Sequence, residues 1–412
     1  MPAELVKTDI LVIGAGPAGA TTALTLAKLG VSHLVVDAAV FPRDKICGDC
    51  LDLKVIRVLR HLDPCIVENE LIGNEFFTPS FGTRFFTQKG NKADFVNQPG
   101  TGTTPPHPLF FTAKRLHFDN FLVQKFDRRY TDFRQGTKVT KIFREGNGWR
   151  VQAKVISTDK DIEIITPLII GADGDHSVLL RYLGERKIDR RHYAGTLRQY
   201  WSNVEGLDAR NLIEVYFPPG LPMSYFYVFP LANGEANVGY GMVSEVAAKG
   251  GFKLRDIFKR LIAEDPLMAP RFQNATPLEE PVGWGIPLAS RRRQAFGDGY
   301  LLVGDAASLV CPTSGEGIGT GMISGYIAAH FAQKALAGNS FDAAQFSNYD
   351  REIYRRLNSE IRLYKLMMAV SPGIYDFGLN WLATNPLFQW SFQRRTAGWL
   401  RTAYEKEIEI SF

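Results

Sequence analysis

The chain has 412 residues, which is enough for two or three domains with sizeable cores. Its composition, with 45% hydrophobic and 22% charged residues, is ordinary for a globular protein, and a net charge of +5 is too small to indicate nucleic-acid binding. No run approaches the roughly 18 apolar residues of a membrane-spanning helix, no signal peptide precedes the first apolar run, and four cysteines are too few for a disulfide scaffold. We therefore expect a cytoplasmic protein.

The first elements are predicted to be a strand, a helix and a second strand. Residues 9–13 are mostly apolar, and residues 18–29 carry apolar side chains at helical spacing until Gly30 ends the helix. Residues 31–36 form another apolar run, which ends at Asp37. A strand, a glycine-rich turn and a helix in this order are typical of a dinucleotide-binding unit.

The glycine-rich turn explains what this unit binds. Gly14 permits a tight turn, Gly16 lets the backbone approach a pyrophosphate, and Gly19 lets the helix pack closely on the strand. The helix N-terminus presents free N–H groups to the phosphates, and Asp37 can accept hydrogen bonds from an adenosine ribose. The expected cofactor contacts are therefore Gly14, Gly16, Pro17, Ala18, Gly19 and Asp37.

The rest of the chain alternates between β-rich and helical segments. Helices are predicted over residues 51–62, 115–128, 252–264 and 318–337, with a hairpin over 138–156 and a strand over 168–170. We expect α/β plus α+β architecture, in which a Rossmann-like domain (1–70, 113–185 and 285–340) is interleaved with a β-sheet-rich substrate domain (71–112 and 186–284) and followed by a helical C-terminal region (341–412).

A second turn near the far end of the chain indicates that the cofactor has two parts. The apolar run 300–303 ends at Gly304 and Asp305, and a carboxylate there can hold ribityl hydroxyls. The loop 311–319 follows, and its glycines allow backbone to lie against a flat ring beside a positive helix start. The cofactor is therefore expected to be FAD, with further contacts at Gly304, Asp305, Pro312, Gly315, Gly317 and Ile318.

Several segments resemble one flavoprotein family. The turn 14–19, the Gly-Ala-Asp-Gly of residues 171–174 and Gly304–Asp305 are similar to glutathione-reductase-type (GR2) flavoproteins of the aromatic-hydroxylase superfamily. Within it, residues 41–48, 225–230 and 311–319 most resemble the geranylgeranyl reductase family. The resemblance implies additional cofactor contacts at Arg43, Cys47, Gly48, Arg115, Val139, Asp173 and Gly174.

This resemblance implies an FAD-dependent enzyme that saturates carbon–carbon double bonds in a prenyl lipid or a similar hydrophobic molecule. Its electrons would come from NAD(P)H or a small electron carrier, which binds transiently because no second Gly-x-Gly-x-x-Gly unit is present. Tyr225, Tyr227 and Phe229 alternate along one predicted strand and share a face, either as the wall of the substrate slot or as ordinary sheet core. Cys47, Tyr225 and Tyr227 are the candidate catalytic residues.

Alternatives remain open at this level. Cys47 is either a catalytic thiol or a small packing residue, and Cys47 with Cys50 is either a redox pair or incidental. No metal is expected, because a zinc site needs two more ligands. Tyr227 stands where the family usually has Trp, which leaves the substrate open more than the fold. Because reduced flavin can also react with O₂, an FAD-dependent monooxygenase or halogenase is the alternative enzyme, and a non-catalytic prenyl-binding escort protein is a third possibility.

The C-terminal region is rich in aromatic residues, among them Tyr364, Phe377, Trp381, Trp390 and Trp399. These side chains either pack into the core of the β-rich domain, roof a lipid tunnel, or rest on a membrane surface as a peripheral contact. The sequence does not indicate an oligomeric state.

Overall fold

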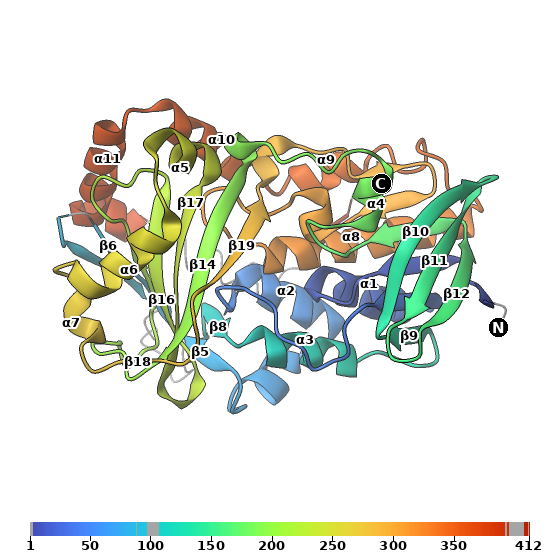
Figure 1. Ribbon diagram of the computed structural model, residues 1–412, viewed down its shortest axis with the longest axis horizontal. Helices are drawn as coiled ribbons and strands as arrows, with labels where there is room; N and C mark the ends of the chain where they lie inside the picture. The colour runs from blue at the N-terminus through green and yellow to red at the C-terminus, as the bar shows by residue number, and fades with distance from the viewer. Residues whose placement is uncertain (1–2, 88, 97–106, 392–393, 395–407, 411) are drawn as a thin grey trace.

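A parallel sheet forms the centre of one half of the molecule (Figure 1). The computed structural model describes residues 3–87, 89–96, 107–391, 394, 408–410 and 412. In this part the sheet has six strands in the order β20 (Phe296–Gly297), β21 (Tyr300–Leu302), β13 (Leu168–Gly171), β2 (Ile10–Ile13), β3 (His33–Asp37) and β9 (Thr131–Gln135). The strands from β21 to β9 run parallel. Their carboxyl ends therefore meet at one edge, although they come from distant parts of the chain.

Two helices lie side by side against this sheet. They are α1 (Pro17–Lys28) and α8 (Ile318–Ala337), and α2 (Leu53–Leu62) packs on α8. A β-carbon at Gly325 would lie 2.2 Å from the carbonyl oxygen of Ala18, so the close approach of α1 and α8 requires a glycine there. α3 (Arg115–Gln124) packs on α1, and α4 (Val178–Tyr182) follows β13.

A smaller sheet stands at the end of this half, where Figure 1 draws it on the right. Its order is β1 (Glu4–Lys7), β12 (Lys160–Thr166), β11 (Gly148–Val155) and β10 (Thr137–Glu145). β10 and β11 pair antiparallel, so the predicted hairpin is present. β1 pairs parallel with β12. The sequence did not predict this pair, because the partners lie far apart in the chain.

The other half of the molecule is built on an eight-stranded sheet. β14 (Tyr193–Ser202), β17 (Glu235–Val243) and β16 (Ser224–Pro230) form its long central strands. Its remaining strands are β15 (Ile213–Tyr216), β6 (Gly82–Phe86), β7 (Lys92–Val96), β18 (Thr276–Pro277) and β19 (Val282–Pro287), and the helices α5 (Ser244–Gly250), α6 (Leu254–Glu264) and α7 (Ala269–Phe272) follow β17. A three-stranded sheet, with β4 (Cys50–Leu51), β8 (Phe110–Thr112) and β5 (Thr78–Ser80), is joined to β16 by a hydrogen bond from the Thr112 hydroxyl to the Pro230 carbonyl.

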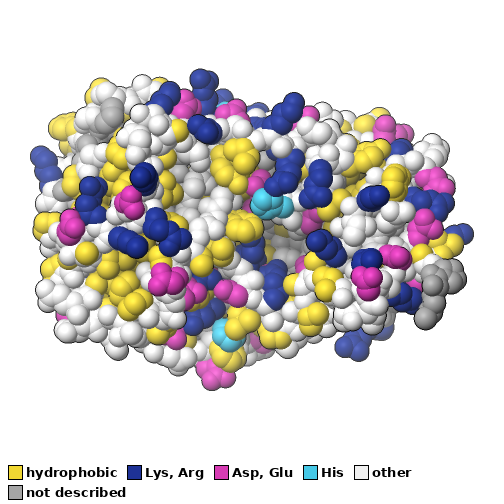
Figure 2. Space-filling view, viewed as in Figure 1, with side chains coloured by type: hydrophobic (Ala, Val, Ile, Leu, Met, Phe, Trp, Pro, Cys, Tyr) yellow, Lys and Arg dark blue, Asp and Glu magenta, His cyan; other side chains and the backbone are white. Residues whose placement is uncertain are grey.

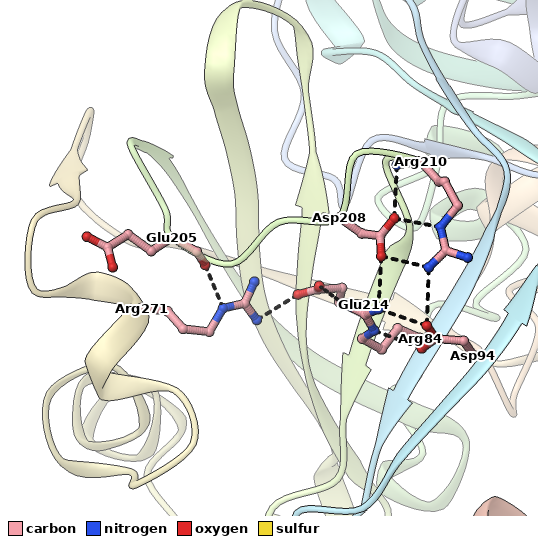
Figure 3. Close-up of polar contacts among 7 residues, drawn as sticks. All are labelled: Arg84, Asp94, Glu205, Asp208, Arg210, Glu214 and Arg271. Carbon is pink, nitrogen blue, oxygen red and sulfur yellow. Dashed lines mark hydrogen bonds and ion pairs between the residues drawn. The ribbon is translucent and has the colours of Figure 1, made fainter.

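A network of ion pairs around one buried carboxylate connects strands of the large sheet (Figure 3). Glu214 on β15 is only 2% exposed, and its Oε2 atom lies 2.6 Å from Nη1 of Arg271 on α7. Arg84 on β6 lies 3.7 Å from the other oxygen of Glu214 and pairs with Asp94 on β7 at 2.8 Å and with Asp208 at 2.9 Å. Elements distant in sequence are thereby held together by paired charges.

The C-terminal region is helical, with α9 (Tyr349–Tyr354), α10 (Asn358–Ala369) and α11 (Pro372–Thr384). Tyr364 is buried, but Phe377 is 72% exposed, Trp381 49% and Trp390 54%. Core packing is therefore the wrong interpretation for these three side chains. Phe392, Trp399 and much of the predicted 341–412 tail beyond residue 391 lie outside the described residues. Within the described part, no helix combines the length and apolar character needed to cross a membrane.

Candidate functional site

The glycine-rich turn after β2 contains two glycines that the packing of the chain itself requires. Gly14 has a φ of +101°, and a β-carbon there would lie 2.5 Å from the carbonyl oxygen of Ala172. A β-carbon at Gly19 would lie 1.9 Å from the carbonyl oxygen of Gly14. These contacts follow from the close approach of β2, β13 and α1, so they do not depend on any ligand.

Gly16 differs, because a β-carbon there would meet no backbone. The nearest atoms would be Nη2 of Arg43 at 3.7 Å and Nη2 of Arg115 at 4.0 Å. The space beside Gly16, at the N-terminus of α1, is therefore open and bordered by two guanidinium groups. Free N–H groups and cations at a helix start are what an anionic phosphate group requires.

One buried carboxylate holds both guanidinium groups. Asp119 on α3 is fully buried; its Oδ2 lies 2.6 Å from Nη1 of Arg43, and its oxygens accept hydrogen bonds from Arg115 at 2.6 and 2.7 Å. Two guanidinium groups and one carboxylate leave these three residues with a net charge of +1 beside Gly16. Arg43 and Arg115 are thus brought together with the glycine turn.

Asp37 at the end of β3 also contacts this turn. Its Oδ2 accepts a hydrogen bond from the N–H of Ala15 at 2.7 Å, and its Oδ1 accepts one from Ala39 at 2.7 Å. A carboxylate oxygen can accept more than one hydrogen bond, so both oxygens retain capacity for ribose hydroxyls. The sequence did not predict these two hydrogen bonds, which hold the turn and the segment after β3 in place.

The segment after β13 lies beside the same turn. The Cα of Asp173 would lie 3.0 Å from a β-carbon at Gly14, and Oδ2 of Asp173 accepts a hydrogen bond from the N–H of Val178 at the start of α4. Gly174 has a φ of +78°. The side chain of Val139 is buried in the core cluster, and the pairing of β10 with β11 shifts just after it; its contact with the cofactor stays a prediction.

The second turn lies directly against the first. Gly304, with a φ of +56°, would place a β-carbon 3.1 Å from Cβ of Ala18 at the start of α1. Asp305 lies next to the loop 311–319, because its Oδ1 would be 3.5 Å from a β-carbon at Gly317. Burial raises the pKa of Asp305, and the positive charges of Lys45 and Arg115 oppose this shift. One extended ligand can therefore contact both turns.

The loop 311–319 is held in place from two sides. The hydroxyl of Tyr225 on β16 donates a hydrogen bond to the carbonyl of Ser314 at 2.5 Å, beside Gly315. The ammonium of Lys54 on α2 lies 3.2 Å from Oε2 of Glu316. The side chains of Pro312 and Ile318 are buried, so the loop offers mainly its backbone and the glycines Gly315 and Gly317 to a ligand.

Three aromatic side chains of β16 share one face, as predicted. The ring centroids of Tyr225 and Tyr227 are 6.3 Å apart, and the rings of Tyr227 and Phe229 stack at 4.4 Å. A β-carbon at Gly48 would lie 3.3 Å from the ring of Phe229 and 3.5 Å from that of Tyr227. The Cys47–Gly48 segment therefore packs against this aromatic face.

The Cys47 thiol lies at the meeting point of these elements. Burial raises the pKa of Cys47, whereas the nearby Arg115 guanidinium and a hydrogen bond from the N–H of Asp49 to Sγ, at 3.4 Å, lower it. Burial also raises the pKa of Cys50 well above its usual range. The four cysteines are free thiols. Burial therefore favours the protonated form of the Cys47 thiol.

Some residues at this site were not predicted from the sequence. Lys45 is largely buried, its ammonium lies over the ring of Trp284, and desolvation lowers its pKa to about 8. Asp49 is fully buried and accepts hydrogen bonds from Tyr200 and Asn237. Figure 2 shows a hollow near the middle of the molecule, between the two halves, with Lys and Arg side chains around it.

A model of the FAD binding domain family matches residues 7–352. The chain belongs to the FAD binding domain family. It is 28% identical over 376 residues to a digeranylgeranylglycerophospholipid reductase from Methanocaldococcus jannaschii, covering 89% of this chain and 88% of that protein. It is also 30% identical over 340 residues to a menaquinone reductase from Mycolicibacterium smegmatis, and the match covers 78% of this chain and 76% of that protein.

The fold is shared with a solved structure of a geranylgeranyl bacteriochlorophyll reductase-like protein from Thermoplasma acidophilum. The TM-score is 0.80 at 21% identity, and the match covers 98% of both chains. The expected FAD-binding fold, the FAD cofactor and the resemblance to geranylgeranyl reductases are confirmed.

The residues present fit FAD. The open space beside Gly16, with its two guanidinium groups, suits a pyrophosphate, whereas the glycine loop and the Asp305 carboxyl group lie where a second, flat part of the ligand can rest. The aromatic face of β16 meets this loop through Tyr225. A hydrophobic molecule bound there would lie against the flat part of the cofactor.

Proposed function

We propose that this protein uses FAD to reduce carbon–carbon double bonds of a hydrophobic, isoprenoid-containing lipid or quinone. The observation that carries the proposal is the meeting of three features in one place: the glycine loop, the Cys47–Gly48 segment and the aromatic face of Tyr227 and Phe229. Relatives named digeranylgeranylglycerophospholipid reductase and menaquinone reductase support the choice of substrate class.

The chain's own residues would bind, orient and exclude water. Arg43 and Arg115 hold the phosphates, Asp37 and Asp305 hold the sugar-like hydroxyls, and Tyr225 fixes the loop beside the ring. Tyr227 and Phe229 give the substrate an apolar wall and keep water from it. When bound, FAD supplies a hydride from its reduced ring, and the protein must supply a proton.

The source of electrons is proposed to be NAD(P)H or a small electron carrier that binds transiently.

The test of the whole proposal is anaerobic photoreduction of the flavin, followed by addition of geranylgeranyl lipids, menaquinone or O₂. We expect reoxidation by an unsaturated isoprenoid and a slow reaction with O₂. Rapid reaction with O₂ coupled to substrate hydroxylation, with no reoxidation by alkenes, would contradict the proposal and favour a monooxygenase.

Replacing Cys47 tests whether its thiol takes part in the reaction. In Cys47→Ala we expect FAD to bind normally but substrate-dependent reoxidation to slow by at least about tenfold, because a proton-bearing group beside the substrate is lost. Stopped-flow absorbance measures the rate, and Cys65→Ala, which removes an exposed thiol, is the control. Unchanged turnover in Cys47→Ala would show that the thiol takes no part in the reaction and that Cys47 is a packing residue.

We also propose that the C-terminal helices make peripheral contact with a membrane, from which a lipid substrate would enter. The exposed apolar residues of this region include Leu366, Ile374, Phe377, Trp381, Leu387 and Trp390, and Arg362 and Lys365 on α10 are exposed as well. Exposed apolar side chains together with cations suit an anionic lipid surface.

The double variant Phe377→Ser with Trp381→Ser is expected to reduce binding to phosphatidylcholine–phosphatidylglycerol vesicles by roughly tenfold or more. The variant lacks two apolar side chains that the wild type would bury in the membrane. Co-sedimentation measures this binding. Ile188→Ser, which changes an apolar residue that is 65% exposed and lies far from the C-terminal region in the sequence, should leave it unchanged. Equal vesicle binding by the wild type, the double variant and Ile188→Ser would contradict the proposed contact.

A further inference from the structure

Asp49 is unusual in its burial, its backbone conformation and its hydrogen bonding. It is fully buried, and its φ of +64° lies in the left-handed region, which few residues with a side chain adopt. Its Oδ1 atom is buried and has no hydrogen-bond partner in the described part of the chain. A strained, buried and incompletely paired carboxyl group beside a reactive site is typical of a functional residue.

The groups around Asp49 leave it without a cation of its own. Tyr200 and Asn237 donate hydrogen bonds to its Oδ2 at 2.7 and 2.8 Å. The guanidinium of Arg198 lies 3.9 Å from the centre of the Tyr200 ring and is already paired with Asp44 and Glu279. Among the other nearby cations, Arg115 is paired with Asp119 and Lys114 with Glu235.

Burial therefore dominates the titration of this group. Desolvation raises the pKa of Asp49 to about 7, against the hydrogen bonds from Tyr200 and Asn237 and the charges of Arg198 and Arg115. A carboxyl group with such a pKa can both hold and release a proton under physiological conditions.

Asp49 is connected to the substrate side of the site through its neighbours. The Asn237 side chain donates a hydrogen bond to the carbonyl of Cys47 at 2.8 Å, and its oxygen accepts one from the Tyr227 hydroxyl at 3.3 Å. The N–H of Asp49 donates to Sγ of Cys47. The Asp49 carboxyl group is thus linked through Asn237 to the backbone of Cys47 and to the Tyr227 hydroxyl.

We propose that Asp49 is the proton reservoir of the reaction and acts through the Cys47 thiol. This inference rests on the proposed function. The reduced cofactor, when bound, would supply a hydride to one carbon of the double bond. The Cys47 thiol gives its proton to the other carbon, and Asp49 transfers its own proton to the sulfur. Two C–H bonds form, the C=C π bond is lost, and Asp49 becomes a carboxylate that water reprotonates after the product leaves. The net proton comes from a carboxylic acid, so no thiolate accumulates in the buried site.

The inference predicts the pH dependence of the reaction. In the wild-type holoenzyme, the rate of substrate-dependent flavin reoxidation should fall as the pH rises through about 7, because Asp49 loses its proton. Asp49→Asn preserves the shape but carries no transferable proton, so we expect a rate at least about tenfold lower below neutral pH and no inflection near 7. Absorbance confirms equal FAD content.

Infrared spectroscopy gives a readout other than activity. The difference between the wild-type and Asp49→Asn spectra should contain a carboxylic-acid C=O band that titrates near pH 7. Taking the difference removes the bands of other buried carboxyl groups, such as Glu316, whose pKa burial also raises to about 7. Tyr200→Phe removes a hydrogen bond that favours the carboxylate, so both the band and the rate inflection should shift to higher pH. Asp350→Asn changes a partly buried carboxyl group on α9, whose pKa burial also raises, and should leave the rate profile unchanged.

The possible failures are distinguishable. If Asp49→Asn retains the wild-type rate and inflection, or if Tyr200→Phe shifts neither the band nor the rate, Asp49 is not the reservoir although the proposed function stands. If the wild-type protein passes electrons to no unsaturated lipid or quinone, both the proposed function and this inference are overturned.

Discussion

The variant Gly16→Val is expected to purify without FAD. The β-carbon and methyl groups of valine would occupy the space beside the N-terminus of α1, within about 4 Å of the two guanidinium groups that face it. A pyrophosphate could no longer approach the backbone. We expect at least a hundredfold loss of affinity, which corresponds to about 3 kcal/mol, in a fluorescence titration with added FAD.

Two other glycines provide controls for this result. Gly338→Val, at the C-terminal end of α8, places its β-carbon at ordinary contact distances and should bind FAD as the wild type does. Gly19→Ala, in contrast, is expected to disturb folding itself, because its β-carbon would collide with the carbonyl of Gly14. Retention of bound FAD by a folded Gly16→Val protein would contradict the assignment of the turn.

The variant Arg271→Ala is expected to lose about 3 kcal/mol or more of unfolding free energy, because among the described residues it leaves only Arg84, 3.7 Å away, as a cationic partner of the buried Glu214 carboxylate (Figure 3). The side chain also donates a hydrogen bond to the Glu205 carbonyl, which would be lost. Urea denaturation followed by circular dichroism measures the change.

The controls for Arg271 separate charge burial from simple loss of a side chain. Arg129→Ala removes an arginine that is 80% exposed and paired with Asp127, so we expect almost no change in stability. Adding Glu214→Gln to Arg271→Met should restore part of the lost stability, because no uncompensated charge remains. Equal stability of Arg271→Ala and the wild type would show that the network does not stabilise the sheet.

The features predicted correctly from the sequence are local ones. The helix α8 spans residues 318–337 as expected from the sequence, and the hairpin of β10 and β11 forms where the sequence places it. The glycine turn, Asp37 and the second turn at Gly304 were found because each follows a strand within a few residues. Their meeting at one sheet edge followed from the parallel order of the strands.

The features that the sequence did not predict depend on contacts between distant segments. The cluster of Asp49, Tyr200 and Asn237 joins three parts of the chain, and none has a spacing that reveals the others. The same is true of Glu214 and Arg271. Aromatic composition alone could not separate buried Tyr364 from exposed Phe377, because composition does not say which face of a helix contacts the rest of the chain.

The central claim is that a single FAD molecule spans the two adjacent turns and lies against the aromatic face. A crystal structure of the protein with bound FAD tests it most directly. We predict the pyrophosphate beside Gly16, within reach of Arg43 and Arg115, and the ring against residues 312–318. Density for FAD at another location, or side chains that fill the space between Gly16 and Asp305 in the FAD-bound protein, would contradict the account.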